Sequence, residues 1–334
     1  MADAHNLTVV TYNLHGFNQG VSLLTSLCGN VDVIFVQEHW LAPFDLHRLY
    51  NFCDDYIRFA SSAMDEVISS SCLHGRPFGG VAILVKKSLG SSSKLVNASS
   101  RYIIVKIGDV LFINVYLPCV STPNRSDVVF DCLSSILNDI GDVHYSHIIF
   151  GGDLNVDIAM DNDNDLCVVL HDFASNLDMK FLHDKLPSDN RMTYRVVTTG
   201  ASASIDHFAV CQSLYNSVHS ITVEDSGINL SDHCPVILNI DIPGFNTLPS
   251  NVKGGTKPRE QLIYRWDVGD TTLYYSLTGN SLNGIEAPIH LLSDSNAGSD
   301  TLAAVNLYYD NIVRSLREAA YTSIPRKKRS HFKY

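Results

Sequence analysis

The first 240 residues alternate short apolar runs, rich in Val, Ile, Phe and Tyr, with polar loops. Such runs are typical of β-strands because branched and aromatic side chains pack well on a pleated surface. The predicted strands are Leu7–Tyr12, Val33–Gln37, Gly80–Val85, Tyr102–Ile107, Val110–Tyr116, Ile148–Phe150, Ile205–Val210, Ile221–Val223 and Val236–Ile240. Gly108-Asp109 is a tight-turn signal between two of these runs, so these two strands are expected to be antiparallel neighbours.

Helical spacing of apolar residues is clearest in Ser126–Ile140, where they fall on one face. Ser126 or Asp127 could cap this helix. Ser22–Cys28 and Leu166–Leu177 show weaker helical patterns. Many short strands interrupted by a few helices indicate an α/β (α+β) fold, in which two sheets pack together and helices lie outside them.

The composition changes after residue 242, because Pro243–Pro258 is rich in Pro, Gly, Asn, Thr and Lys, as linkers are. We predict one domain over residues 1–242, a linker over 243–265 and a partly helical, basic tail over 266–334. Within the tail, Leu302–Ala320 has the spacing of an amphipathic helix. The rest of the tail is too short and too rich in loop residues to predict a second domain.

Bulk composition limits the class of protein. Hydrophobic residues make up 45% and charged residues 18% of the 334, as in ordinary globular chains. The apolar runs are strand-length, far below the ~18 residues of a membrane span, so no membrane association is expected. Eight cysteines lie singly without metal-binding spacing, which indicates buried free thiols in a reducing compartment. The N-terminus does not read as a secretory signal, so we expect an intracellular protein.

The formal net charge of −11 argues against a protein that wraps nucleic acid through a broad basic face. It does not exclude an enzyme whose acidic residues bind metal, because bound cations reverse the local field where a phosphate docks. The end of the chain is basic, and Arg326–Arg329 fits a nuclear address, a nucleic-acid contact or a solvated chain end.

Polar residues at the ends of predicted strands are the candidate functional residues, since apolar strand bodies would hold them rigidly. They are Asn13, Glu38, Asp153, Asn155, Asp206, Asp232 and His233. Each alone fits an ordinary turn or a solvated charge. Together they predict a site for phosphodiester hydrolysis, which needs an activated water and neutralisation of the extra charge in the transition state.

The chemistry assigns a role to each residue type. Glu38 and Asn13 suit Mg²⁺ or Mn²⁺, and Asp232 adds negative charge near the metal. Asp153 can orient or deprotonate water, and Asn155 can aim that water or hold a phosphate oxygen. His233 can donate to the phosphate, with Asp206 holding its ring and raising its pKa. No nucleophilic Ser or Cys stands in a recognisable turn motif, so direct attack by water is expected.

These residues stand in ordered motifs that resemble the endonuclease/exonuclease/phosphatase superfamily. The motifs are TYNLHG around Asn13, FVQEHW around Glu38, NVYLP with Tyr116, GGDLN at 151–155, Ile205-Asp206 and Ser231-Asp232-His233. The resemblance spans about residues 7–242. It implies a four-layer sandwich of two mixed β-sheets flanked by helices, with Asp153 as the base and Tyr116 touching the scissile phosphate.

Within that superfamily, the chain is most similar to the endonuclease domain of non-LTR retrotransposons. The similarity rests on QEHW-L at 37–41, on MTYR at 192–195 followed by IDHFAV, and on the tail from Tyr264. It implies a monomeric enzyme that nicks DNA, leaves 3′-hydroxyl and 5′-phosphate ends, and has a reverse transcriptase domain in cis in the parent element. Target reading would fall to Arg58–Pro77 and Pro187–Ala203, and Arg191, Thr193 and Arg195 are the candidate substrate contacts.

Two positions depart from the motifs. His15 stands where abasic-site endonucleases tend to carry Asp, and Cys119 stands where they carry Asn. Two other functions therefore stay open: a small-molecule or lipid phosphoesterase of the same fold, and a non-catalytic remnant that binds nucleic acid.

Overall fold

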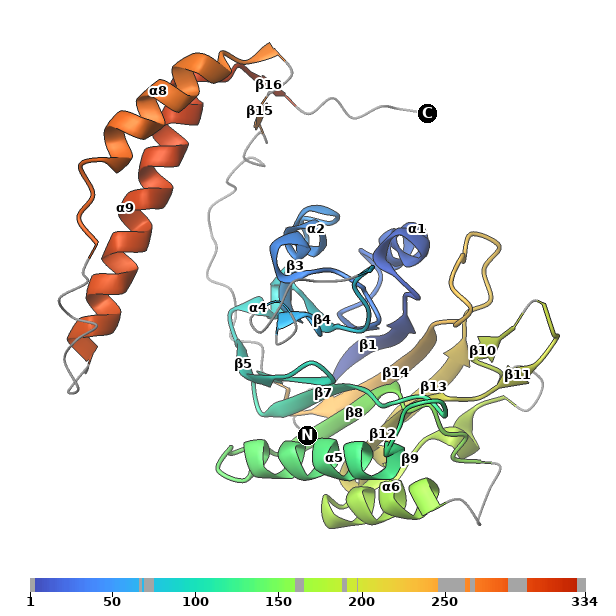
Figure 1. Ribbon diagram of the computed structural model, residues 1–334. Coiled ribbons are helices and arrows are strands. Elements are labelled where there is room, and N and C mark those ends of the chain that lie inside the picture. The colour runs from blue at the N-terminus through green and yellow to red at the C-terminus, as the bar shows by residue number, and fades with distance from the viewer. Residues whose placement is uncertain are drawn as a thin grey trace. The chain divides into compact units, whose positions relative to one another are not determined.

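In the computed structural model, the chain divides into two compact units, Met1–Asn251 and Val252–Tyr334. The structure describes residues 4–65, 68, 75–159, 165–187, 191–196, 198–245, 262–264, 268–287 and 299–328. Figure 1 shows the elements of both units.

Two six-stranded sheets form the centre of the first unit. The first sheet has the order β13-β14-β1-β2-β4-β3, with bounds Val218–Val223, Val236–Pro243, Ala4–Asn13, Val33–Gln37, Val81–Lys86 and Tyr56–Ser61. The second has the order β5-β6-β7-β8-β12-β9, with bounds Ser93–Ala98, Tyr102–Ile107, Val110–Tyr116, His147–Asp153, Asp206–Cys211 and Met179–Phe181. Each sheet is mixed, because β1–β2 and β7–β8 are parallel while the other pairs are antiparallel.

The inner faces of the two sheets form the largest apolar core of the unit. Its aromatic centre is Phe35, whose ring centroid lies 6.5 Å from that of Phe112 and 5.9 Å from that of Phe208. These three side chains come from β2, β7 and β12 and are all at most 1% exposed. These rings add to a core made mostly of Val, Ile and Leu, whose burial between the sheets stabilises the sandwich.

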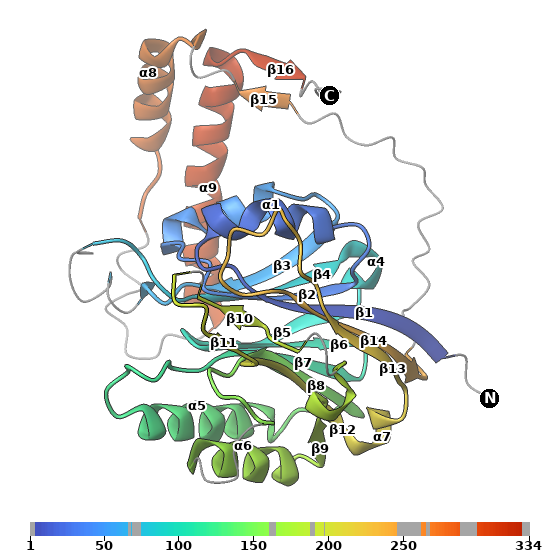
Figure 2. The same cartoon turned by 90° about the vertical axis from the view of Figure 1, so that its right-hand side faces the viewer.

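Helices cover the outer faces of both sheets, as Figure 2 shows. Helices α1 (Phe17–Leu27) and α2 (His47–Asn51) contribute buried residues to a second apolar cluster on the outside of the first sheet. Helices α5 (Arg125–Ile140) and α6 (Asp165–Asn176) do the same for the second sheet. The predicted four-layer sandwich of two mixed sheets flanked by helices is confirmed.

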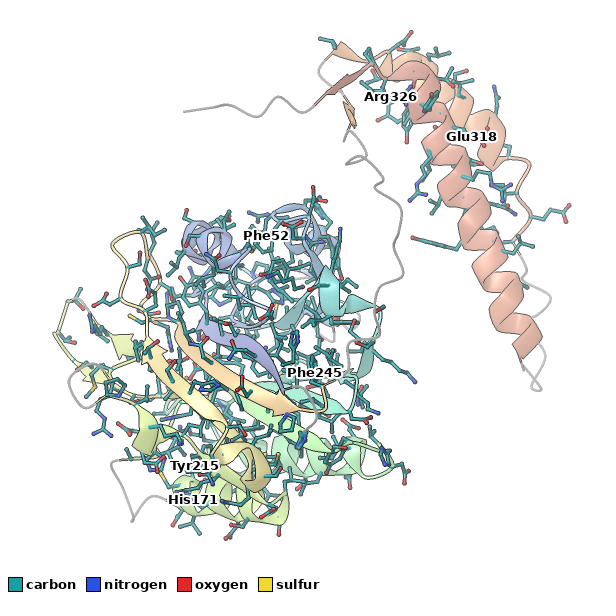
Figure 3. The ribbon with its side chains drawn as sticks, turned by 180° about the vertical axis from the view of Figure 1, so that it is seen from behind. Phe52, His171, Tyr215, Phe245, Glu318 and Arg326 are labelled. Atoms are coloured by element: carbon teal, nitrogen blue, oxygen red, sulfur yellow. The ribbon has the colours of Figure 1, made fainter. Side chains whose placement is uncertain are left out.

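Shorter elements complete this unit: η1 (Pro43–Asp45), α4 (Lys87–Gly90), η2 (His183–Lys185), α7 (Gln212–Tyr215) and the two-stranded pair β10 (Tyr194–Arg195) and β11 (Ser202–Ala203). His171 of α6 is labelled in Figure 3. Its ring packs edge-on against that of Phe181 in β9, with 5.6 Å between the ring centroids.

Several details differ from the sequence expectation. Arg58–Pro77 was expected to be a loop, but it begins inside β3, and residues 66–67 and 69–74 of it lie outside the described residues. Helix α5 is preceded at its N-cap by Asn124, in a left-handed conformation and without a side-chain cap, so the predicted caps Ser126 and Asp127 are wrong. The seven cysteines that the structure describes are free thiols, as predicted, but Cys28, Cys53 and Cys119 are only partly buried.

The second unit holds more regular structure than the sequence predicts. Helix α9 (Ser299–Ser323) includes the predicted helix Leu302–Ala320, and α8 (Thr271–Leu282), capped by Asp270 through Leu273 N at 2.8 Å, was not anticipated. Strands β15 (Leu262–Tyr264) and β16 (Arg326–Lys328) pair antiparallel. The predicted linker 243–265 thus contains a strand near its end, and residues 246–261 and 265 of it lie outside the described residues.

The basic run at the end of the chain is partly ordered. Its first three residues form β16, and Arg329 lies outside the described residues. The guanidinium of Arg326, which is labelled in Figure 3, lies 3.5 Å from the centroid of the Tyr321 ring. In the described part of the chain, no helix has the length and apolar character needed to span a bilayer.

Candidate active site

The pairing of the strands brings the predicted site residues to one edge of the two sheets. Asn13 ends β1 and lies opposite Gln37, which precedes Glu38. Asp153 ends β8 and lies opposite both Tyr116 of β7 and Asp206, the first residue of β12. Contacts between β1 and β8 link the two sheets at this point. Residues that are far apart in the sequence therefore meet where the strands stop.

Asp153 is the buried centre of the site, with 1% of its surface exposed. One of its oxygens, Oδ2, accepts from Asn13 Nδ2 at 2.9 Å and from Asn155 Nδ2 at 3.1 Å. The other, Oδ1, accepts from Asn155 N at 2.9 Å. Burial raises the pKa of Asp153, and the negative charge of Asp206 raises it further. The charge of His233 and the hydrogen bonds to Asp153 lower this pKa, but their effect is smaller. A carboxylate with a raised pKa is a better acceptor for a proton from water.

Gly152, one residue earlier, allows β8 to approach β7 closely. Its φ is 140°, and a Cβ atom at this position would lie 1.9 Å from Val115 O. Only glycine fits this backbone and this space. Gly152 is therefore a structural requirement for the position of Asp153.

His233 and Asp206 form a buried pair beside Asp153. His233 Nδ1 lies 2.9 Å from Asp206 Oδ2, and His233 Nε2 lies 3.9 Å from Asp153 Oδ2. Burial alone would lower the pKa of His233, but the charges of Asp206 and Asp153 and the hydrogen bond to Asp206 raise it. The predicted action of Asp206 on the ring of His233 is what the geometry shows.

Loop residues that sequence reasoning did not select hold this pair. Asn229 Nδ2 donates to His233 O at 2.7 Å, and Asn229 Oδ1 accepts from Tyr12 OH at 2.6 Å. Ser231 Oγ accepts from His233 N at 3.1 Å and donates to Asn13 O at 2.8 Å. Loop 229–233 is thereby tied to the end of β1. Of the two loop residues that form these hydrogen bonds, Ser231 alone belongs to a motif identified in the sequence, Ser231-Asp232-His233, and Asn229 does not.

Thr193 corrects one prediction. It was a candidate substrate contact, but its side chain is fully buried. Its Oγ1 accepts from Ile205 N at 3.0 Å and from Asp206 N at 3.1 Å. Thr193 therefore fixes the start of β12, and with it the position of the Asp206 carboxylate.

Glu38 lies on the other side of Asp153, in a tightly turned segment. Its Oε1 accepts from Asn13 Nδ2 at 3.0 Å and its Oε2 accepts from Trp40 Nε1 at 2.9 Å. Glu38 and Trp40 have φ angles of 49° and 51°, a conformation that costs free energy for residues other than glycine and clusters at functional sites. Burial, and next the charges of Glu38 and Asp153, raise the pKa of Tyr116.

Asn13 is placed to orient its neighbours. Its Nδ2 donates to both Glu38 and Asp153, and its Oδ1 accepts from His15 N at 2.9 Å. The amide oxygen is thus already engaged, so this geometry favours an orienting role over the metal-ligand role predicted for Asn13. The charge-bearing oxygens around it belong to Glu38 and Asp153.

The side chains present fit a divalent cation. Asp153, Asp206 and His233 each place one potential ligand atom within 4.8 Å of the others, and because the raised pKa of His233 keeps its ring protonated, the carboxylate oxygens are the atoms available to an ion. Asp206 Oδ1 is buried, and no hydrogen-bond donor of the described residues reaches it, which is costly for a carboxylate without a cation or water nearby. Glu38 adds a further carboxylate at this edge, and oxygen ligands of this kind suit Mg²⁺ or Mn²⁺.

The two departures from the family motifs have clear surroundings. His15 Nδ1 lies 3.0 Å from Asp232 Oδ1, and the His15 ring lies 4.8 Å from that of Trp40. Burial would raise the pKa of Asp232, but His15 and His233 lower it. Cys119 is half-buried with its Sγ 3.2 Å from Ser121 Oγ, a contact that lowers the pKa of the thiol.

The two predicted arginine contacts differ in their positions. Arg195 N donates to Asp232 O at 2.9 Å, so its segment borders the site. Its guanidinium, however, forms an ion pair of 2.6 Å with Asp225 on the exposed surface, which compensates its charge. Arg191 is half-buried. Burial lowers the pKa of His183, and the positive charge of Arg191 lowers it further.

The fold recurs in solved structures of low sequence identity. A 3′ phosphatase of Neisseria bound to its product DNA hairpin is 16% identical, with a TM-score of 0.55 over 71% of this chain and 100% of that one. An AP endonuclease of Archaeoglobus fulgidus is 16% identical (TM-score 0.52, 71% and 100%). An AP endonuclease of Leishmania major is 14% identical (TM-score 0.56, 71% and 88%). No curated protein sequence matches significantly.

A family model gives the decisive comparison. The model described as the Endonuclease/Exonuclease/phosphatase family matches residues 10–233, which include every motif residue of the site from Asn13 to His233. The chain belongs to the Endonuclease/Exonuclease/phosphatase family.

Proposed function

We propose that the protein is a divalent-metal-dependent phosphodiester hydrolase that nicks DNA and leaves 3′-hydroxyl and 5′-phosphate ends. The observation that carries this proposal is the buried Asp206–His233 pair at 2.9 Å beside Asp153. A positively charged donor next to a carboxylate of raised pKa supplies both an acid and a base at one place.

In this proposal, Asp153 accepts a proton from the attacking water, and Asn13 and Asn155 hold its carboxylate in place. His233 donates its Nε2 proton toward a phosphate oxygen while Asp206 holds its ring. Glu38 and Asp232 would supply the carboxylates that hold Mg²⁺ or Mn²⁺, and the bound ion would neutralise charge on the phosphate. The Tyr116 hydroxyl, kept protonated by its raised pKa, donates to the scissile phosphate.

DNA is the proposed substrate because the family includes nucleases and because a similar structure was solved with a DNA hairpin. The residue motifs that resemble non-LTR retrotransposon endonucleases support a finer proposal. Residues 1–242 would be the monomeric, nuclear endonuclease, and the linker and tail would lead to a reverse transcriptase in cis. A small-molecule phosphoesterase and a non-catalytic remnant are the alternatives that an activity assay separates.

The test is conversion of supercoiled plasmid to open circles in the presence of Mg²⁺ or Mn²⁺. We expect the wild type to nick, EDTA to stop it, and Asp153→Ala and His233→Ala each to lose at least ~100-fold in rate, as loss of a principal acid or base should cause. Asp109→Ala and His219→Ala are matched controls, because both side chains are more than half exposed and lie outside the site. A polymerase should extend the nicks directly if they carry 3′-hydroxyls.

Plasmid that stays supercoiled with folded wild-type protein and either metal would contradict the nicking proposal. Hydrolysis of a small phosphodiester under the same conditions would then point to the small-molecule alternative. Binding of DNA without any hydrolysis would point to the remnant.

A further inference from the structure

A hollow of about 240 Å³ lies beside the candidate active site and is lined by two arginines and two aromatic rings. We call it the arginine pocket and define it by Arg48, Arg76, Phe17 and Trp40. None of these side chains has a role in the hydrolysis proposed above, apart from the hydrogen bond of Trp40 to Glu38.

Both guanidinium groups are held over rings. The Arg48 guanidinium carbon lies 4.6 Å from the centroid of Phe17, and that of Arg76 lies 4.2 Å from the centroid of Trp40. Arg48 also donates from one terminal nitrogen to Asn18 Oδ1 at 2.5 Å. Stacking uses the flat face of a guanidinium and leaves its N–H edge for an anion.

The charges of these arginines are uncompensated within the described residues. No described carboxylate lies within 4.0 Å of either guanidinium, whereas Arg195 is paired with Asp225. In a chain of net charge −11, two adjacent cations without a carboxylate partner among the described residues form a local positive spot. Such a spot would attract an anionic ligand and would repel cations.

The start of helix α1 reinforces this polarity. The helix begins at Phe17 in the wall of the pocket, carries no acidic residue in its first turn, and has no side-chain cap on Gly16. The N-terminus of an 11-residue helix carries a partial positive charge that favours anions. The two arginines and the helix terminus thus act in the same direction.

Trp40 separates this pocket from the catalytic carboxylates. Its Nε1 donates to Glu38 Oε2 at 2.9 Å while its ring carries Arg76. Gly16 N donates to Glu38 O at 2.8 Å, and a Cβ on Gly16 would lie 2.5 Å from the Trp40 ring. The pocket is therefore one indole ring away from the proposed metal ligand.

We propose that the arginine pocket binds a second phosphate of the substrate, the backbone phosphate next to the scissile one on the same nucleic-acid strand. The proposal rests on the hydrolase function above and adds the two residues, Arg48 and Arg76, that position the strand beside the cleaved bond. Guanidinium groups match the oxygens of a phosphate in bidentate fashion, so each arginine adds affinity and fixes the strand in register. A substrate with a single phosphate does not use the pocket.

The experiment compares Arg48→Ala, Arg76→Ala and the double variant with Lys94→Ala, which removes an exposed cation from strand β5. Two substrates are used: a short labelled DNA duplex and bis(p-nitrophenyl) phosphate, which has one phosphate. For DNA we expect KM to rise about 5–10-fold per arginine and the slope of log KM against log salt to fall by about 1 per arginine. For bis(p-nitrophenyl) phosphate we expect rates within about twofold of wild type.

Equal DNA KM and salt slope in the double variant and in Lys94→Ala would overturn the proposal. A second outcome would also overturn the proposal: an arginine variant that is less inhibited by inorganic phosphate but binds DNA as well as the wild type. The pocket would then bind a free anion and not a phosphate of the DNA strand. Fluorescence anisotropy of the same labelled duplex repeats the comparison without catalysis. If the wild type hydrolyses neither substrate, the hydrolase function fails, and the anisotropy difference alone decides whether the pocket contacts nucleic acid.

Discussion

The pairing of Asp206 with His233 can be tested by removing one charge. In the wild type, His233 Nδ1 lies 2.9 Å from Asp206 Oδ2. The substitution Asp206→Asn keeps the size of the side chain and an oxygen that can accept this hydrogen bond. It removes the negative charge that raises the pKa of both His233 and Asp153. The pKa of both groups should therefore fall, with opposite consequences for an acid and for a base.

The size of the effect follows from the pKa of His233, which its surroundings raise to about 10. At pH 7.5 the wild-type imidazole is almost fully protonated. Without the Asp206 charge, the pKa of His233 should fall, because burial then opposes only the remaining charges of Asp153 and Asp232. At the ordinary pKa of about 6.5, about one molecule in ten would keep the proton at pH 7.5, so the nicking rate should fall by up to ~10-fold from this cause alone.

The loss should shrink in acid. Near pH 6 the variant His233 regains more of its proton, and the lowered pKa of Asp153 leaves more of that base ionised than in the wild type. The rate optimum of Asp206→Asn should thus lie at lower pH than that of the wild type.

The assay is the initial nicking rate from pH 5.5 to 8.5 at fixed Mg²⁺ and ionic strength, together with an NMR titration of the imidazole nitrogens. Asp225→Asn is the control, because this carboxylate is exposed and pairs with Arg195. A rate loss of equal size at every pH, with an unchanged pKa of His233, would refute the reasoning.

Two further predictions concern stability. Gly152→Ala should lower the free energy of unfolding by about 3 kcal/mol in urea denaturation, because its Cβ would lie 1.9 Å from Val115 O. Gly141→Ala, at an αR position with no Cβ contact under 3.4 Å, should be neutral or slightly stabilising, and similar losses in both would contradict the steric account. Burial lowers the pKa of His39 to about 4, so the folded state binds fewer protons than the unfolded one between pH 4 and about 6.5. The contribution of His39 to the free energy of unfolding should therefore be complete above about pH 6.5 and fall by about 3 kcal/mol as the pH falls to 4. In His39→Asn the free energy of unfolding should depend less on pH over this range. Parallel curves of unfolding free energy against pH for the two proteins would disprove this account.

Sequence patterns located the central strands but not several at the sheet edges. β2, β6 and β7 have the predicted bounds, because both faces of these strands are buried and the apolar run is continuous. The sequence patterns missed β3, β5 and β9, and each of these is an edge strand of its sheet. An edge strand is covered less, so β5 can carry exposed polar side chains that hide its pattern.

The site was predictable where side chains emerge directly from strand ends. Asp153 and Asp206 are partners in the ladder between β8 and β12, so the pleat itself places their carboxylates together. The residues that act through the backbone were not predictable. Thr193 and Asn229 hold main-chain groups of other segments, and a sequence carries no sign of which distant backbone a hydroxyl or amide will meet.

The same distinction applies to the arginines. Arg195 was selected from a motif, but its guanidinium is neutralised by Asp225. Arg48 lies in no motif, and Arg76 lies in the predicted target-reading segment Arg58–Pro77 but was not singled out there. Each rests on an aromatic ring without a described acidic partner. An arginine that already forms an ion pair must give up that pair before it can bind a phosphate, and the free energy lost in doing so weakens the binding. In an acidic protein, nucleic-acid contacts should therefore be sought among cations that stack on rings near the catalytic edge, rather than among those nearest to a motif in the sequence.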